Sequence, residues 1–229
     1  MTSAAELSLG DTSAALVERP GRMIAFEGGE GAGKSTQAAR LAATIGAELT
    51  REPGGSTVGE RIRRLLLDPE TETGGAAIGA RTELMLALAA RAQHVSERIR
   101  PALEAGVDVV VDRFSASTLA YQGYGRGLPV SEIRRACDLA TGGLWPDLTI
   151  LLHVPIEMGA ARRAGAGSKP DRFESQGGAF HERVAEGFLA LAADEPGRWT
   201  VIDGTGDEDE VATLVLEAVH RKLGPKAAR

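Results

Sequence analysis

The segment GGEGAGKS at residues 28–35 constrains this chain more than any other feature. It matches G-x-x-x-x-G-K-[ST], a loop whose glycines let backbone N–H groups turn inward around phosphate oxygens. The apolar run Met23–Phe26 before it predicts a buried strand, and Lys34 begins a helical pattern whose N-terminal dipole favours an anion. The motif predicts a nucleoside triphosphate site, with Lys34 on the β- and γ-phosphates and Ser35 on Mg²⁺.

Composition limits the other possibilities. The 229 residues, 43% apolar and 25% charged, are typical of one globular domain. A net charge of −6 disfavours binding to nucleic acid or to an anionic membrane, and no apolar run approaches the roughly 18 residues of a membrane span. The single cysteine, Cys137, excludes an intramolecular disulfide and fits a reducing compartment, so we expect a cytoplasmic protein. Residues 1–20 predict a flexible tail without a signal peptide, ahead of a domain at 21–229.

Strand-like and helix-like segments alternate along the domain. We expect strands at Met23–Phe26, Glu48–Thr50, Val107–Val111, Leu148–Val154 and Trp199–Ile202, and helices at Lys34–Ile45, after Ser56, at Arg81–Leu103, after Ser131, at Ile156–Ala164, Phe173–Ala193 and Glu208–Leu223. Ser56 and Ser131 are expected to cap their helices. The alternation predicts an α/β fold with a parallel sheet and helices on both faces.

Three charged features outside the loop predict where chemistry occurs. Asp112 ends an apolar strand, where a Mg²⁺ partner belongs, and the neighbouring Arg113 suits a second anionic substrate; the alternative is an ion pair at the strand end. Arg91 lies on the apolar face of its helix and is either a ligand contact or half of an ion pair. Arginines and one lysine, Lys169, flank a Gly/Ala stretch at about residues 163–173, which fits a lid over phosphates or a solvated loop.

Several motifs occur in the order found in bacterial thymidylate kinases. They are EGGEGAGKS at 27–35, TREPGG at 50–55, AAR at 89–91, DRFSASTLAYQG at 112–123, PDLT at 146–149 and DRFE at 171–174. The chain resembles that family over about residues 22–223. The resemblance implies a P-loop NTPase three-layer sandwich with five parallel strands in the order 2-3-1-4-5. It also implies a homodimer that transfers the γ-phosphoryl group of ATP to dTMP, giving dTDP and ADP.

The resemblance also implies roles for individual residues. It assigns ATP binding to Gly28, Gly29, Glu30, Gly31, Ala32, Gly33, Lys34, Ser35, Thr36 and Arg163, and dTMP binding to Glu30, Glu52, Pro53, Arg63, Arg91, Arg113, Thr118, Tyr121 and Gln122. Within the second set, Arg113 holds the dTMP phosphate, Arg91 bonds thymine, and Tyr121 packs under the sugar where a 2′-hydroxyl would clash. The residues expected to act in catalysis are Lys34, Arg113, Lys169 and Arg172, and those expected to hold Mg²⁺ are Ser35 and Asp112.

Two features depart from the family pattern. Ala87 stands where the family usually has an aromatic residue stacked on thymine, with Phe114, Met85 and Leu88 as nearby candidates to fill the gap. The middle of the lid lacks arginines, so its catalytic cation is expected to be Lys169 or Arg172. Two alternatives stay open from the sequence: a kinase for another nucleotide or a deoxynucleoside, and a non-catalytic ATP-binding protein.

Overall fold

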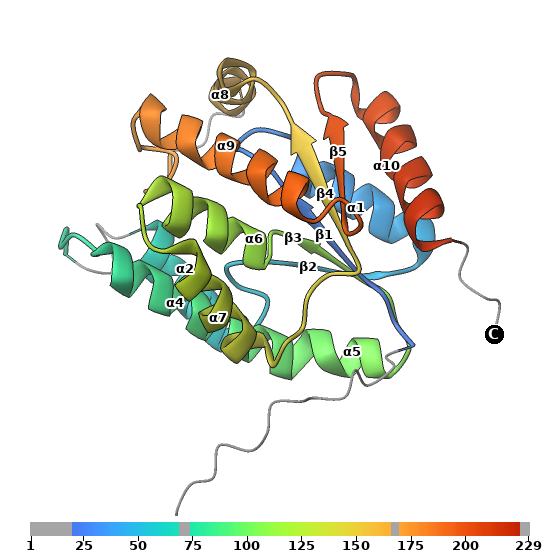
Figure 1. Cartoon of the computed structure of the whole chain (residues 1–229), viewed down its shortest axis with the longest axis horizontal. Coiled ribbons are helices and arrows are strands. Elements are labelled where there is room, and N and C mark those ends of the chain that lie inside the picture. Colours follow the sequence, from blue (N-terminus) through green and yellow to red (C-terminus); the bar gives the residue numbers. More distant parts are fainter. Residues whose placement is uncertain (1–19, 69–73, 166–169, 225–229) are drawn as a thin grey trace, which may run out of the picture.

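A computed structural model describes residues 20–68, 74–165 and 170–224 (Figure 1). Within these ranges, the strands form one parallel sheet in the order β2-β3-β1-β4-β5. The strands are β1 (Met23–Glu27), β2 (Glu48–Arg51), β3 (Val109–Asp112), β4 (Leu148–His153) and β5 (Trp199–Asp203). The strand order and the five strand positions agree with the prediction from sequence.

Helices cover both faces of the sheet and give three layers (Figure 1). They are α1 (Lys34–Ile45), α2 (Thr57–Leu67), α4 (Ala80–His94), α5 (Arg100–Glu104), α6 (Ser115–Thr118), α7 (Val130–Thr141), α8 (Ile156–Gly165), α9 (Gly178–Asp194) and α10 (Glu208–Leu223), with π-helical segments η1 (Val95–Ile99) and η2 (Leu119–Gly125). Helices α1 and α10 pack on the face that carries Phe26 and Ile150. The α4–η1–α5 stretch, α7 and α9 pack on the opposite face. No helix among the described residues is long and apolar enough to cross a membrane.

Three helix predictions need correction. The helix expected to start at Phe173 starts at Gly178, because the Asp171 carboxylate accepts the backbone N–H groups of Phe173 (2.8 Å) and Glu174 (2.9 Å) and closes a turn there. Ser131 does not cap α7, which begins one residue earlier with Pro129 at the N-cap. The helix expected over Arg81–Leu103 is interrupted by the π-helical turn η1. Ser56 does cap α2, through a 3.0 Å bond from the Gly59 N–H.

The helical stretch α6–η2 had no counterpart in the sequence analysis. Its first turn is capped from a different strand, because Glu27 Oε1 of β1 accepts the N–H groups of Phe114 (2.9 Å) and Ser117 (3.1 Å). Such a cap leaves no local signature, since the carboxylate lies 87 residues away in the sequence from the first N–H that it accepts. The same bonds tie the end of β3 to β1, where the site begins.

Two predicted features fall partly outside the described ranges. Of the tail expected at residues 1–20, only Pro20 is described, and residues 166–169 of the lid, Lys169 included, are not.

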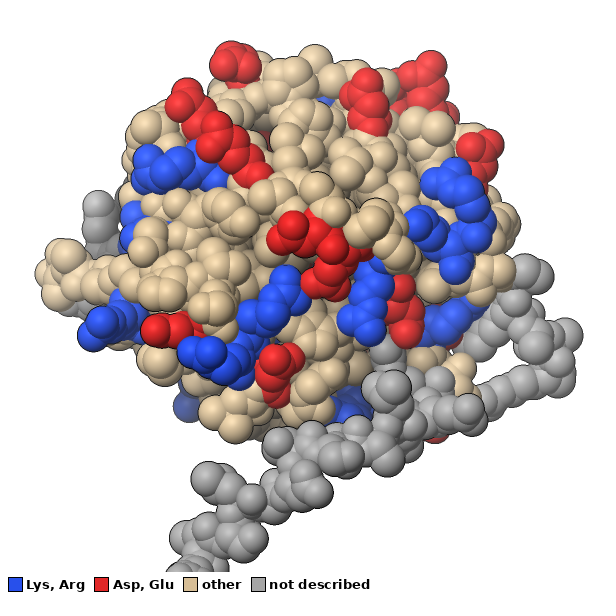
Figure 2. Space-filling model, viewed as in Figure 1, with Lys and Arg blue, Asp and Glu red and all other residues tan. Residues whose placement is uncertain are grey.

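Acidic and basic side chains intermingle over the face shown in Figure 2.

Candidate active site

The phosphate loop, residues 28–35, joins β1 to α1 at the carboxyl end of the sheet. Gly33 is the N-cap of α1 with φ 87°, a left-handed conformation that glycine adopts freely. At Gly31 (φ 73°) a Cβ would lie 2.1 Å from the carbonyl oxygen of Gly159, so α8 packs directly on the loop. Lys34 Nζ donates to the Gly29 carbonyl (2.6 Å), and burial lowers the pKa of Lys34 to about 8. The loop therefore places a buried amine and the α1 N-terminus at one point, which suits a polyphosphate.

Ser35 and Asp112 meet beside the loop. Ser35 Oγ donates to Asp112 Oδ2 (2.5 Å), while Asp112 Oδ1 is buried with no hydrogen-bond partner in the described chain. A hydroxyl and a carboxylate with one unsatisfied oxygen are oxygen ligands of the kind that Mg²⁺ prefers. No cluster of three acidic, His or Cys ligands occurs in the described ranges. The residues fit a Mg²⁺ that takes few protein ligands and completes its shell from phosphates and water.

Arg113 follows Asp112 in a left-handed conformation (φ 68°), which is rare for a residue with a side chain. Its Nη2 donates to Glu30 Oε1 (2.7 Å) and its Nη1 to Ser117 Oγ (3.1 Å). The Tyr121 hydroxyl donates to the same Glu30 oxygen (2.6 Å), and the Arg113 guanidinium lies 5.2 Å from the Tyr121 ring centroid. The arginine is thereby held at the mouth of the phosphate loop.

Glu27 and Glu30, three residues apart, have pKa values that are shifted in opposite directions. Burial would raise the pKa of Glu30, but Arg113 and Lys34 outweigh it and lower the pKa to about 2. At Glu27 burial dominates and raises the pKa to about 7, although Ser117, which donates from Oγ (2.6 Å), and Arg113 oppose it. Glu30 is therefore a fixed negative charge in the site, and Glu27 titrates near neutral pH.

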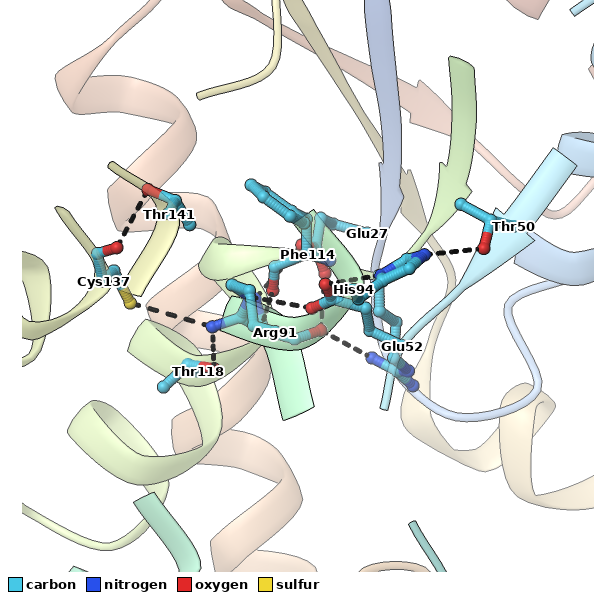
Figure 3. Close-up of polar contacts among 11 residues, drawn as sticks. Glu27, Thr50, Glu52, Arg91, His94, Phe114, Thr118, Cys137 and Thr141 are labelled. Carbon is cyan, nitrogen blue, oxygen red and sulfur yellow. Dashed lines mark hydrogen bonds and ion pairs between the residues drawn. The ribbon is translucent and has the colours of Figure 1, made fainter. Parts of the chain in front are cut away.

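Arg91 of α4 is buried in a network formed by several elements (Figure 3). Its Nε donates to Glu52 Oε2 (2.7 Å), its Nη1 to Thr118 Oγ1 (2.9 Å) and its Nη2 to the Phe114 carbonyl (3.0 Å). Burial alone would lower the pKa of Arg91, but Glu52 outweighs it and the pKa is raised. The ion pair expected as one reading of Arg91 is present, and the arginine also lines a cavity, so its role as a ligand contact stays a prediction.

His94 belongs to the same network, and the sequence analysis missed it. Its Nδ1 donates to Glu52 Oε1 (3.0 Å), and its Nε2 lies 2.8 Å from Thr50 Oγ1 (Figure 3). The available signal was its position three residues after Arg91, which puts both side chains on the same face of a helix. We call Thr50, Glu52, Arg91, His94 and Thr118 the base network, because the family resemblance places the thymine base beside Arg91.

A cavity of about 970 Å³ joins the phosphate loop to the base network. The predicted site residues that line it are Glu30, Gly31, Ala32, Gly33, Lys34, Ser35, Thr36, Glu52, Pro53, Arg63, Arg91, Arg113, Thr118, Tyr121, Gln122 and Arg163. Gly28, Gly29, Asp112 and Arg172 do not line it, and Lys169 lies outside the described residues. Two segments far apart in sequence, residues 30–36 and 113–122, thus face one space.

Comparisons with known proteins agree with this geometry. The sequence model of the thymidylate kinase family matches residues 26–215. The chain belongs to the thymidylate kinase family. It is 49% identical to the thymidylate kinase of Desulfovibrio desulfuricans over 211 residues (87% of this chain, 95% of the relative) and 50% identical to that of Thermomicrobium roseum over 201 residues (86% and 93%). Its fold matches the crystal structure of thymidylate kinase from Ehrlichia chaffeensis with a TM-score of 0.70 at 31% identity, over 87% of this chain and 98% of that one. The predicted family and fold class are confirmed.

The lid of this thymidylate kinase family member differs from expectation at Arg172. Its Nη1 pairs with Glu83 Oε2 of α4 (2.6 Å) and its Nε donates to the Leu66 carbonyl of α2 (2.8 Å), so the guanidinium is bound to these two helices and does not line the cavity. Arg163 does line the cavity and pairs with Glu174 (3.7 Å). Arg162 of α8 donates to the carbonyls of Gly204 (2.9 Å) and Thr205 (3.3 Å) and ties that helix to the turn after β5.

Ala87 lines the cavity, but the three residues considered as candidates to fill the gap beside it do not. Phe114 is fully buried under Arg91, Met85 is 59% exposed, and neither of them nor Leu88 lines the cavity. Phe173 does line the cavity and contacts the Tyr121 ring edge-on at 5.5 Å. Among the described residues, α4 therefore presents no aromatic side chain to the cavity beside Arg91.

Proposed function

We propose that this chain transfers the γ-phosphoryl group of ATP to dTMP, with the two nucleotides meeting in the 970 Å³ cavity. The reaction is the one by which its family is named. The observation that carries the proposal is that Lys34, Arg113 and Arg91 all line this one cavity. A cradle for a polyphosphate, a cation for a second phosphate and a polar end for a base are the parts that such a transfer needs.

On the donor side, the phosphate loop and Lys34 bind the ATP phosphates, and Arg163 lies toward the adenine. Ser35 and Asp112 hold Mg²⁺, which supplies positive charge to the triphosphate when it is bound. Glu30 keeps Arg113 in place through their 2.7 Å bond. Because Glu30 remains ionised down to about pH 2, this anchor does not change over the physiological range.

On the acceptor side, Arg113 binds the dTMP phosphate, while Arg91, Thr118 and Gln122 face the base. The Tyr121 ring, fixed by Glu30, lies under the sugar, and Glu52, Pro53 and Arg63 complete the wall, with Arg63 Nη1 donating to the Pro53 carbonyl (2.7 Å). The acceptor phosphate is already an anionic nucleophile, so no side chain has to act as a strong base. Positioning and charge neutralisation supply the rate. Lys169 supplies a lid cation, and Arg172 holds the end of the lid against α4.

The assembly is proposed to be a homodimer, as the family resemblance implies. Support comes from large apolar side chains left exposed on neighbouring helices, Val58 on α2, Met85 on α4 and Leu139 on α7. Size-exclusion chromatography with light scattering tests it, and a monomeric mass at micromolar concentration would contradict it. The cytoplasmic location expected from the sequence stays a prediction.

An ADP-release assay with dTMP, dUMP, dCMP, dGMP and UMP as acceptors tests the reaction. We expect the highest kcat/KM with dTMP and dependence on Mg²⁺. A preference for another acceptor would favour a different nucleotide kinase, and ATP binding without turnover on any acceptor would favour a non-catalytic ATP-binding protein.

A further inference from the structure

Glu83 is a fully buried carboxylate on α4 to which the proposed reaction gives no role. Three side chains from other parts of the chain bond to it. Gln122 Nε2 donates to Oε1 (2.8 Å), Arg172 Nη1 bonds Oε2 (2.6 Å), and Arg126 reaches both oxygens (3.3 and 3.1 Å). Two guanidinium groups balance the buried charge, so the carboxylate is well supported where it stands.

Gln122 is the member of this cluster that also faces the cavity. Its side chain is buried within η2, with 4% of the residue exposed, and it lines the base end with Arg91. An amide has a donor end and an acceptor end of nearly the same shape, so its orientation is set by its partners. A carboxylate only accepts, so Glu83 requires Gln122 to present Nε2 to it and Oε1 on the other side. Among the described residues, no group donates to Oε1, which leaves it available to a ligand.

The consequence for a bound base follows from hydrogen-bond polarity. Thymine and uracil carry an N3–H donor beside the O4 acceptor, whereas cytosine carries an N3 acceptor beside an N4 amino donor. Arg91 offers only N–H donors, and the oriented Gln122 offers an acceptor. This pair matches thymine or uracil and opposes cytosine at both positions.

We propose that Glu83 is a positioning residue that sets pyrimidine specificity by fixing the orientation of the Gln122 amide. The inference rests on the proposed function, because it concerns the base of the acceptor nucleotide. Replacing the carboxylate by an amide at position 83 provides a donor as well as an acceptor, so Gln122 becomes free to turn over and to present Nε2 to the cavity.

The test compares Glu83→Gln with Glu97→Gln, a matched control. Glu97 lies exposed on η1, farther along the same helical stretch, and also accepts from a glutamine, Gln93 Nε2 (2.9 Å). The measurements are kcat/KM for dTMP, dUMP and dCMP, and the Kd of each nucleotide without ATP. In Glu83→Gln we expect the dTMP:dCMP ratio of kcat/KM to fall at least about tenfold, with Kd changing in the same sense, while dTMP:dUMP is unchanged. Glu97→Gln should leave both ratios at the wild-type values.

Glu83→Asp is the second variant, because it keeps a charge for the two arginines while withdrawing it from Gln122 by one methylene. We expect the dTMP:dCMP ratio of kcat/KM in Glu83→Asp to fall at least about threefold. This variant tests the inference if Glu83→Gln does not fold. A dTMP:dCMP ratio within twofold of wild type in the folded variants would overturn the inference alone, however much overall activity falls. An equal fall in dTMP:dUMP would overturn it too. A wild-type chain that uses dCMP as well as dTMP would overturn the proposed function together with this inference.

Discussion

The two ends of the cavity are built in different ways. At the phosphate end, one continuous stretch of chain, residues 28–35, supplies glycines, a lysine and a helix N-terminus. At the base end, the base network takes side chains from β2, α4, α6 and the turn after β2, and buries an ion pair of Glu52 with Arg91. The first end offers positive charge through backbone geometry, and the second offers polar side chains that hold one another in place.

The two ends should therefore be sensitive to different substitutions. A backbone cradle fails when its cation is removed, because that cation supplies charge aimed at the phosphates. A side-chain network fails when any partner is lost, because a buried charge is then left unpaired.

Lys34→Ala should lower kcat/KM by about 10²–10³-fold or more, because it removes positive charge aimed at the phosphates. The melting temperature should change little, since the amine is bonded only to the Gly29 carbonyl among the described residues. Steady-state kinetics and thermal unfolding measure the two effects. The control is Lys222→Ala, whose amine bonds the Pro196 carbonyl at the surface. Turnover of Lys34→Ala close to that of the control would show that the loop is not the donor site.

Glu52→Gln should lower stability and dTMP binding through the base end of the cavity. It leaves the buried Arg91 without its charge partner, so the free energy of unfolding should fall by about 3 kcal/mol. Calorimetry should show weaker binding of dTMP and unchanged binding of ATP. Glu48→Gln, which breaks an exposed pair with Arg98, should reduce stability by less than about 1 kcal/mol. If ATP affinity fell as much as dTMP affinity in Glu52→Gln, the two ends would not be separable.

Glu27→Gln should change how stability depends on pH. The folded-state pKa of Glu27 is raised from 4.5 to about 7, so the folded chain holds this proton more tightly than the unfolded chain. The contribution is present below about pH 4.5 and is lost as pH rises to about 7, a fall of about 1–3 kcal/mol in wild type. Glu30, with a pKa of about 2, contributes no slope in that window.

Urea unfolding at pH 5, 6, 7 and 8 measures the slope, with Glu195→Gln as a control at a half-buried ion pair with Arg134. In Glu27→Gln the fall in unfolding free energy across this range should be smaller than in wild type. Parallel curves for wild type and Glu27→Gln would contradict the assignment of this titration to Glu27.

Ala87→Phe should have the smallest effect and a favourable one. The added ring meets an open part of the cavity wall four residues before Arg91, on the same face of α4. Stacking of a base on an aromatic ring is worth about 1–3 kcal/mol, so dTMP binding should tighten a few-fold to tenfold. Weaker dTMP binding would mean that the space is already taken when the nucleotide binds.

The same contrast explains what the sequence could predict. The phosphate loop is local, so its motif predicted the strand, the loop, the helix and the roles of Lys34 and Ser35. The members of the base network come from segments up to 68 residues apart, and only the family motifs placed Arg91 and Thr118 together. Glu83 and His94 were missed because a buried polar residue on a helix has no local signature of its distant partners. The pair of Arg172 with Glu83 was not foreseen either, because a lid charge is visible in the sequence and its partner on α4 is not.

If both nucleotides share one cavity, with phosphates at one end and thymine at the other, a single molecule that joins them should occupy both ends. Titration calorimetry with a bisubstrate analogue, adenosine and thymidine joined 5′ to 5′ by five phosphates, tests this directly. We expect one molecule bound per chain, displaced by ATP and by dTMP, with a Kd at least about 100-fold below that of ATP, because the second contact is intramolecular. An affinity no better than that of ATP, or displacement by only one of the two nucleotides, would contradict the shared cavity.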